Sequence, residues 1–168
     1  LREIAYEGES GFDQLRNLDE DVKTEILNAL GHFPNENEET WILTIVKLIS
    51  PEIHDFIHCY TAGGYQAIRM HQEGDEKSKD LERIISGFMK QFSLLPKLNS
   101  ECYHYSKSNE LLDYFKENDT FELNSFMSCS KPGLDFAYVS NPATVINFTS
   151  ANQGAFLGAM TRESCERE

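Results

Sequence analysis

Apolar residues recur at helical spacing through the first hundred residues of the chain. Val22, Ile26, Leu27 and Leu30 share one face of a predicted helix, and Gly31 follows as a stop signal. The predicted helices cover residues 18–30, 39–49, 51–69 with an interruption near Gly63-Gly64, and 81–92, the last of them ending near Pro96.

Beyond residue 99 the pattern changes to short segments rich in Phe, Tyr, Val and Ser, separated by polar turns. This alternation is typical of strands. We expect strands over 101–105, 120–128, 136–139 and 145–149, a short helix over 108–115, and a connecting loop over 154–160. Because helices precede strands along the chain, the predicted class is α+β.

The chain has 168 residues, 40% of them hydrophobic, which suits one compact domain with a real core. The most apolar stretch, 41–49, is about half of the roughly 20 residues that a membrane span needs, and it contains Lys47. No membrane span is therefore expected. No signal peptide is visible, but the chain begins at Leu1, so we expect a piece of a longer protein.

The net charge is −13, from 28 acidic and 15 basic residues. Binding to a phosphate backbone needs the opposite sign, so nucleic acid is not an expected partner. Basic or arginine-bearing protein surfaces fit better, although acidity also serves solubility alone.

The four cysteines, Cys59, Cys102, Cys129 and Cys165, stand singly without a Cys-x-x-Cys pair, which argues against zinc. Reduced, mostly buried thiols in an intracellular protein are expected, and two bridges in a secreted protein remain open.

Two further sets of side chains have simpler interpretations. His54 and His58 at i, i+4 spacing suit a metal on a helix, but no third ligand stands nearby, so no metal is expected. An aromatic set at near-helical spacing favours core packing over a cofactor site; it consists of Tyr60, Tyr65, Phe88 and Phe92.

Three motifs carry candidate chemistry. The chain ends in Glu166-Arg167-Glu168, and on a strand both carboxylates would lie on one face. One carboxylate could then stabilise a cationic transition state while the other transfers a proton. Ser128-Cys129-Ser130 places two hydroxyls on one side, and Tyr103-His104 lies on a predicted strand. Taken singly, these motifs also suit a frayed acidic terminus, an edge strand before the Lys131-Pro132-Gly133 turn, and a structural histidine.

In this order the motifs resemble the mono-ADP-ribosyltransferase family of the arginine-serine-glutamate type, which includes bacterial toxins and effectors. That family carries an aromatic-Arg strand, a Ser-Thr-Ser strand and a Glu-x-Glu segment. Further likeness lies in 57–61, 65–68, 146–148, Gly154 and 160–161, so that the resemblance covers roughly residues 55–168.

The resemblance implies an N-terminal helical segment over 1–50, followed by an ADP-ribosyltransferase-like catalytic domain over 51–168. The core of that domain would be a split pair of small sheets that clasps NAD as a substrate, without a metal. Glu168 would hold the nicotinamide ribose and stabilise the oxocarbenium-like state, Ser128 would orient Glu168, and Glu166 would assist an arginine acceptor. The implied NAD-binding residues are His104, Tyr105, Ser130, Phe136 and Arg69.

The chain also departs from the family. His104 stands where the family has an arginine that anchors the NAD phosphate, and a histidine should bind phosphate more weakly. Arg69 is a candidate for the missing phosphate contact. The family's strand continues with apolar residues beyond the second glutamate, so either a C-terminal segment is missing after Glu168 or the glutamates are not on a core strand.

The expected function is transfer of ADP-ribose from NAD to a protein side chain, most simply an arginine of a host protein. The expected setting is secretion by a bacterium and action in the host cytoplasm. The alternatives are an NAD glycohydrolase, a binding module on the same fold that has lost catalysis, and a plain helical interaction domain.

Overall fold

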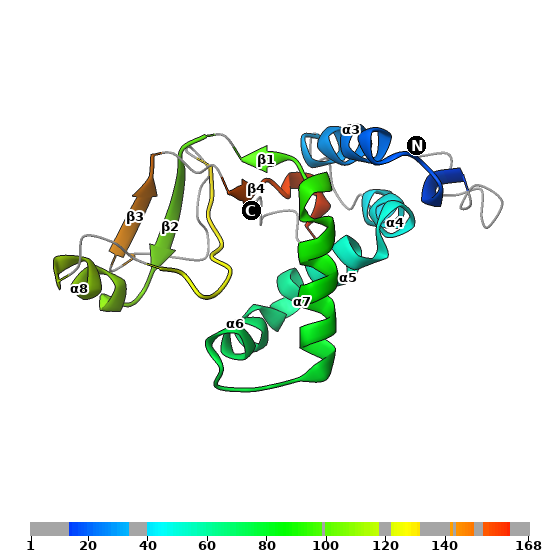
Figure 1. Cartoon of the computed structure of the whole chain (residues 1–168). Helices are drawn as coiled ribbons and strands as arrows, with labels where there is room; N and C mark the ends of the chain where they lie inside the picture. The colour runs from blue at the N-terminus through cyan, green and yellow to red at the C-terminus, as the bar shows by residue number, and fades with distance from the viewer. Residues whose placement is uncertain are drawn as a thin grey trace.

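The computed structural model describes residues 14–33, 40–98, 100–117, 122–131, 142, 144–149 and 153–161. Within them helices combine with two small antiparallel sheets, which confirms the α+β class (Figure 1). The predicted strand 136–139 lies outside these residues, as do the predicted site residues Phe136, Glu166 and Glu168.

The predicted helices of the first hundred residues are confirmed. They are α3 (Glu20–Gly31), α4 (Thr40–Ile49), α5 (Pro51–Cys59), α6 (Tyr65–Glu73) and α7 (Lys79–Gln91). Side-chain caps fix two of the starts: Ser50 Oγ accepts a hydrogen bond from the Ile53 amide at the start of α5, and Ser78 Oγ accepts one from the Leu81 amide at the start of α7.

The predicted interruption between α5 and α6 is a π-helical turn, Tyr60–Gly64. Gly63 has a φ of 93°, a conformation that costs little only for glycine. Gly64 packs against the preceding helix so closely that a methyl group there would lie 2.5 Å from the Cys59 carbonyl oxygen. The two glycines therefore allow the chain to bend here without a long loop.

The helices α3, α4, α5, α6 and α7 share one hydrophobic core with the short 3-10 turn Gly158–Met160. The core contains residues from both sides of residue 50, where we predicted a boundary between two segments. Its fully buried side chains are Leu27, Leu30, Ile42, Ile45, Val46, Ile53, Ile57, Ile68 and Met160.

Two short sheets adjoin this helical part. The strand β1 (Lys97–Leu98) pairs with β4 (Gly154–Ala155), and β2 (Cys102–Ser106) pairs with β3 (Thr144–Phe148), all antiparallel. The helix α8 (Glu110–Glu117) follows β2, as predicted. In Figure 1 the helix α7 stands between α3–α5 on one side and the β2–β3 sheet with α8 on the other.

Two expectations of the second half were wrong. The region 154–160 is not a plain loop, because it contributes β4 and the 3-10 turn to the fold. The described part of the predicted strand 120–128, residues 122–128, has no strand structure, because its backbone bonds to side chains of other elements instead of to a neighbouring strand. No helix in the described ranges is long and apolar enough to span a membrane.

Candidate functional site

The segment 122–131 passes between the helical part and the β2–β3 sheet and is held at both of its ends. At its beginning, the Phe126 amide donates to Gln72 Oε1 at 3.0 Å and Ser125 Oγ donates to Glu73 Oε1 at 3.3 Å, both acceptors lying on α6. At its end, Ser130 exchanges two backbone hydrogen bonds of 2.9 Å with Tyr103 on β2. These contacts fix the path of the serine motif that lies between them.

Ser128 is the meeting point of the segment with β2. His104 Nδ1 lies 2.8 Å from the Ser128 carbonyl oxygen. Because a carbonyl oxygen only accepts, Nδ1 must be the donor and carry the proton of this hydrogen bond. The Tyr103-His104 and Ser128-Cys129-Ser130 motifs are therefore in direct contact.

The hydroxyl of Ser128 is bonded to a helix on the opposite side. Its Oγ lies 2.7 Å from the Oη of Tyr60, the first residue of the π-helical turn after α5. Tyr60 is buried, and its ring stacks on Phe56 at 5.5 Å. A buried phenol gains by finding such a polar partner, so the contact both satisfies Tyr60 and orients the serine.

Ser128 and Ser130 line a cleft of about 530 Å³ between α5, α7 and the segment 122–131. This volume is within the range of roughly 300–1,000 Å³ typical of small-molecule sites. The wall is mostly apolar and rich in aromatic rings, namely those of Phe56, Tyr60, Phe88, Phe92, Phe126, Phe148 and Phe156.

The aromatic wall is itself well packed. Phe56 and Phe88 stack with centroids 3.8 Å apart and planes 10° apart, and Phe126 meets Phe56 edge-on at 4.9 Å. Edge-to-face contacts such as that of Phe126 with Phe56 stabilise aromatic clusters beyond their burial. The cluster therefore gives one side of the cleft a fixed shape.

Lys131 is the one charged side chain among the lining residues that the structure describes. Its Nζ lies 3.6 Å from the centroid of the Phe156 ring, a cation–π contact. The cleft thus combines a large aromatic surface, serine hydroxyls and one cation.

The other described residues of the predicted site lie around the cleft and do not line it. His104 stands behind Ser128 on β2. Tyr105 follows on the opposite face of the strand, with its ring 6.4 Å from that of Tyr103.

Arg69 lies on α6 with its side chain 63% exposed. Its Nε is 2.8 Å from Glu73 Oε1, and this hydrogen bond raises the pKa of the guanidinium. Neither Arg69 nor Tyr105 belongs to the cleft wall.

Two cleft residues, Tyr60 and Lys131, are not among the site residues predicted from the sequence. Tyr60 was grouped with the core aromatics, which its burial confirms, but its hydroxyl contact with Ser128 has no signal in a single sequence. Lys131 was read as part of a turn. One member of the aromatic set was wrongly assigned to the core: Tyr65, the first residue of α6, is 50% exposed.

A network of hydrogen bonds marks the outer face of the β2–β3 sheet. The Glu101 carboxylate accepts from Tyr103 Oη at 2.8 Å and from Asn147 Nδ2 at 2.6 Å. These two bonds lower the pKa of Glu101, with the larger effect from Tyr103, and the same contact raises the pKa of Tyr103. Tyr103 is also the residue that pairs with Ser130, so the network borders the serine motif.

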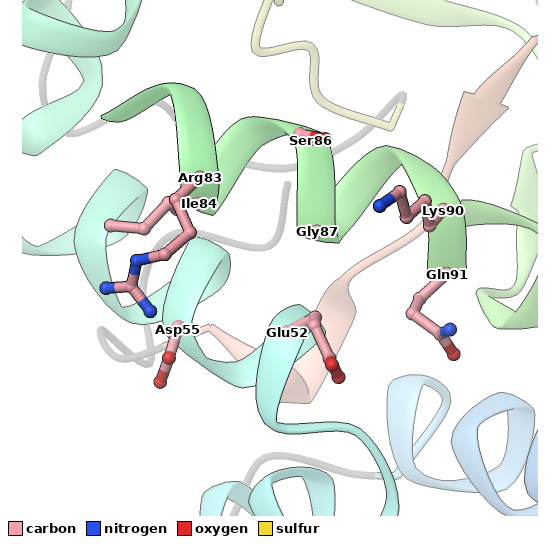
Figure 2. Close-up of a pocket in the computed structure, with 8 residues that line it drawn as sticks. All are labelled: Glu52, Asp55, Arg83, Ile84, Ser86, Gly87, Lys90 and Gln91. Carbon is pink, nitrogen blue, oxygen red and sulfur yellow. The ribbon is translucent and has the colours of Figure 1, made fainter. Parts of the chain in front are cut away.

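A second depression, of about 320 Å³, lies between α5 and α7 on another part of the surface. Figure 2 shows Glu52 and Asp55 on one side of it and Arg83 and Lys90 on the other. It contains none of the predicted site residues, and no ring lines it. We therefore place the candidate site in the larger cleft.

His54 and His58 lie together on α5 with ring centroids 5.7 Å apart, and His54 Nδ1 is 3.2 Å from Asp55 Oδ1. In the part of the chain that the structure describes, no group of three or more His, Cys, Asp or Glu residues is placed to hold a metal ion. Of the cysteines, Cys59 and Cys102 are free thiols; Cys102 is buried, and Cys59 and Cys129 are half-buried.

Comparison of the chain with family models, with curated proteins and with solved structures gives no match.

Proposed function

We propose that the protein is an NAD-dependent mono-ADP-ribosyltransferase whose substrate site is the cleft lined by Ser128 and Ser130. The observation that carries the proposal is the contact of His104 with Ser128 at the wall of a cleft of about 530 Å³. The motifs that resemble those of the family thus lie together, although 24 residues separate them in the chain.

The described wall suits a dinucleotide in three respects. Its aromatic rings offer stacking surfaces for planar bases, its serine hydroxyls offer hydrogen bonds to ribose, and Lys131 offers a charge for phosphate. A site of this composition also excludes water from one side of the reacting bond, which strengthens every electrostatic interaction inside it.

In the proposed reaction the bond between the ribose anomeric carbon and the nicotinamide nitrogen breaks, and its electron pair leaves with nicotinamide. Positive charge develops on the sugar, and the carboxylate of Glu168 stabilises it. A nitrogen of the acceptor arginine then bonds to the anomeric carbon, and Glu166 accepts the proton that this nitrogen loses.

In the proposed site each described motif residue has a role. Ser128, with its hydroxyl oriented by Tyr60, positions the glutamate and the ribose. His104 fixes the backbone at Ser128 through its Nδ1–H. The acceptor would be a protein of the host cell, and the setting a secreted bacterial effector.

The test is transfer of label from NAD to arginine-rich protein acceptors, with nicotinamide release measured in parallel. We expect Glu168→Gln and Ser128→Ala to lower transfer by about 100-fold or more and about tenfold, respectively. Glu76→Gln, an exposed acid after α6, is the matched control for charge. Absence of both label and nicotinamide release in the wild-type protein would overturn the proposal, whereas nicotinamide release without label would assign an NAD glycohydrolase.

The second candidate is a binding module that holds NAD without cleaving it. The engagement of the Ser128 hydroxyl by Tyr60 favours it, because a hydroxyl already bonded to the protein is less available to a catalytic carboxylate. Calorimetric binding of NAD with no turnover over a day would support this candidate.

A further inference from the structure

Lys131 is placed as a single cation in an apolar cleft of a strongly acidic protein. The chain carries a net charge of −13, yet the charged side chain found in the described wall of the cleft is a lysine. No ion pair of Lys131 with a carboxylate is found within the described ranges. Its contact there is the ring of Phe156.

Both partners of this contact are anchored through their backbones. Ser130, which directly precedes Lys131, exchanges two hydrogen bonds with Tyr103 on β2. The Phe156 amide donates to the Pro96 carbonyl oxygen at 2.8 Å, and the Phe156 ring packs 4.9 Å from the His32 ring. The backbone on both sides of this contact is therefore held, and the ammonium group lies over the Phe156 ring at the wall of the cleft.

A ring face attracts a cation but does not neutralise it. In an apolar environment an ammonium group is stabilised much further by an anion with oxygen atoms, and it can offer three donors to one. The cleft as described thus has an electrostatic preference for a ligand that is aromatic in one part and anionic in another.

We propose that Lys131 is the phosphate-binding residue of the cleft and makes it selective for nucleotides over nucleosides. The inference rests on the proposed function, because it assigns the NAD phosphates to that site. Lys131 would supply the phosphate contact in place of His104, because His104 Nδ1 is bonded to the Ser128 carbonyl oxygen and His104 does not line the cleft. Arg69 is the less suitable candidate, because its guanidinium is paired with Glu73 and lies outside the cleft wall.

The experiment is titration calorimetry of the full chain with NAD, ADP and adenosine at two salt concentrations. We compare the wild type with Lys131→Met, which keeps the apolar stem, and with Lys131→Arg, which keeps the charge. Lys107→Met, at an exposed position in the turn after β2, removes the same charge away from the cleft.

We expect Lys131→Met to weaken NAD and ADP about tenfold while adenosine binds as before. Lys131→Arg and Lys107→Met should retain wild-type affinities, and the salt dependence of ADP binding should fall in Lys131→Met. Equal loss of ADP and adenosine, or no loss of either, would overturn the assignment of Lys131.

The outcomes also separate this inference from the proposed function. If ADP binding depends on Lys131 but NAD is never cleaved, the phosphate site stands and the transferase proposal fails. If NAD is cleaved and Lys131→Met binds it normally, the transferase stands and the role of Lys131 fails. A wild-type protein that binds neither NAD nor ADP would overturn both.

Discussion

The Oη of Tyr60 lies 2.7 Å from the Oγ of Ser128, which joins the end of α5 to a residue 68 positions later in the chain. The bond is partly buried and lies at the wall of the candidate cleft. It couples the rigid helical part to the segment that carries the serine motif.

Tyr60→Phe removes this hydrogen bond without changing the ring. We expect the free energy of unfolding to fall by about 1 kcal/mol, measured by urea denaturation, because Ser128 loses a partner in a partly buried site. Tyr65→Phe is the control, since Tyr65 is half exposed, and should change stability by less than about 0.5 kcal/mol. Equal stability of the two variants would show that the Tyr60 contact contributes nothing.

His104 should be replaceable by a residue that keeps its donor. Asparagine can offer an amide N–H toward the Ser128 carbonyl oxygen, whereas leucine cannot donate at all. We expect His104→Leu to lower the free energy of unfolding by about 1–2 kcal/mol and His104→Asn by less. If chemical denaturation gives the same free energy of unfolding for His104→Leu and His104→Asn, the hydrogen bond to the Ser128 carbonyl oxygen does not stabilise the contact between the two motifs.

Glu101 gives a pH dependence with a defined sign. Its pKa is lowered from 4.5 in the folded protein, so its contribution to stability is present above that value and is lost as pH falls through the folded pKa. Tyr103→Phe should raise the pKa of Glu101 more than Asn147→Ala does, because the Tyr103 hydrogen bond is the larger cause. Carboxyl chemical shifts followed by NMR through the acid range measure this order, and the reverse order would contradict it.

Tyr103, the hydrogen-bond partner of Glu101, gives a pH dependence in the alkaline range. The pKa of Tyr103 is raised from 10.0, chiefly by its hydrogen bond to Glu101. The contribution of Tyr103 to the stability of the fold is therefore complete below pH 10 and is lost as pH rises through the folded pKa. Glu101→Gln should lower the pKa of Tyr103 toward its ordinary value, as seen in the ultraviolet absorbance of tyrosinate. No change in the alkaline titration on this substitution would exclude the effect.

Sequence patterns predicted the helices well because helical periodicity is local. The interruption at Gly63-Gly64 and the strand at His104 were predicted for the same reason. The region from residue 120 to 128 was misread as a strand, since its alternation of Phe, Met and Ser is typical of strands. Its actual partners are remote side chains, Gln72 and His104, which no local pattern reveals.

The candidate site was predicted only in outline. Ser128, Ser130 and His104 do come together at β2, but Tyr60, the partner of Ser128, and Phe156, the partner of Lys131, belong to remote parts of the chain. The two-residue strands β1 and β4 are too short to leave a periodic signal. Long-range packing therefore sets the chemistry of the cleft, and local propensity sets the elements that surround it.

Among the described glycines with positive φ, Gly158 should tolerate substitution least, because the 3-10 turn Gly158–Met160 packs against α3. Its φ is 50°, and a methyl group there would overlap the Gly31 carbonyl oxygen and the Phe156 ring. Gly74, with a φ of 90° and open space around it, is the matched control for backbone strain alone. We expect Gly158→Ala to lower the free energy of unfolding by about 3 kcal/mol and Tm by about 6–12 °C, against about 1 kcal/mol for Gly74→Ala. Thermal unfolding followed by circular dichroism measures both. If the two alanine variants melt at the same temperature, the 3-10 turn that follows Phe156 does not pack on α3 as described, and the position of the Phe156 ring beside Lys131 loses its support.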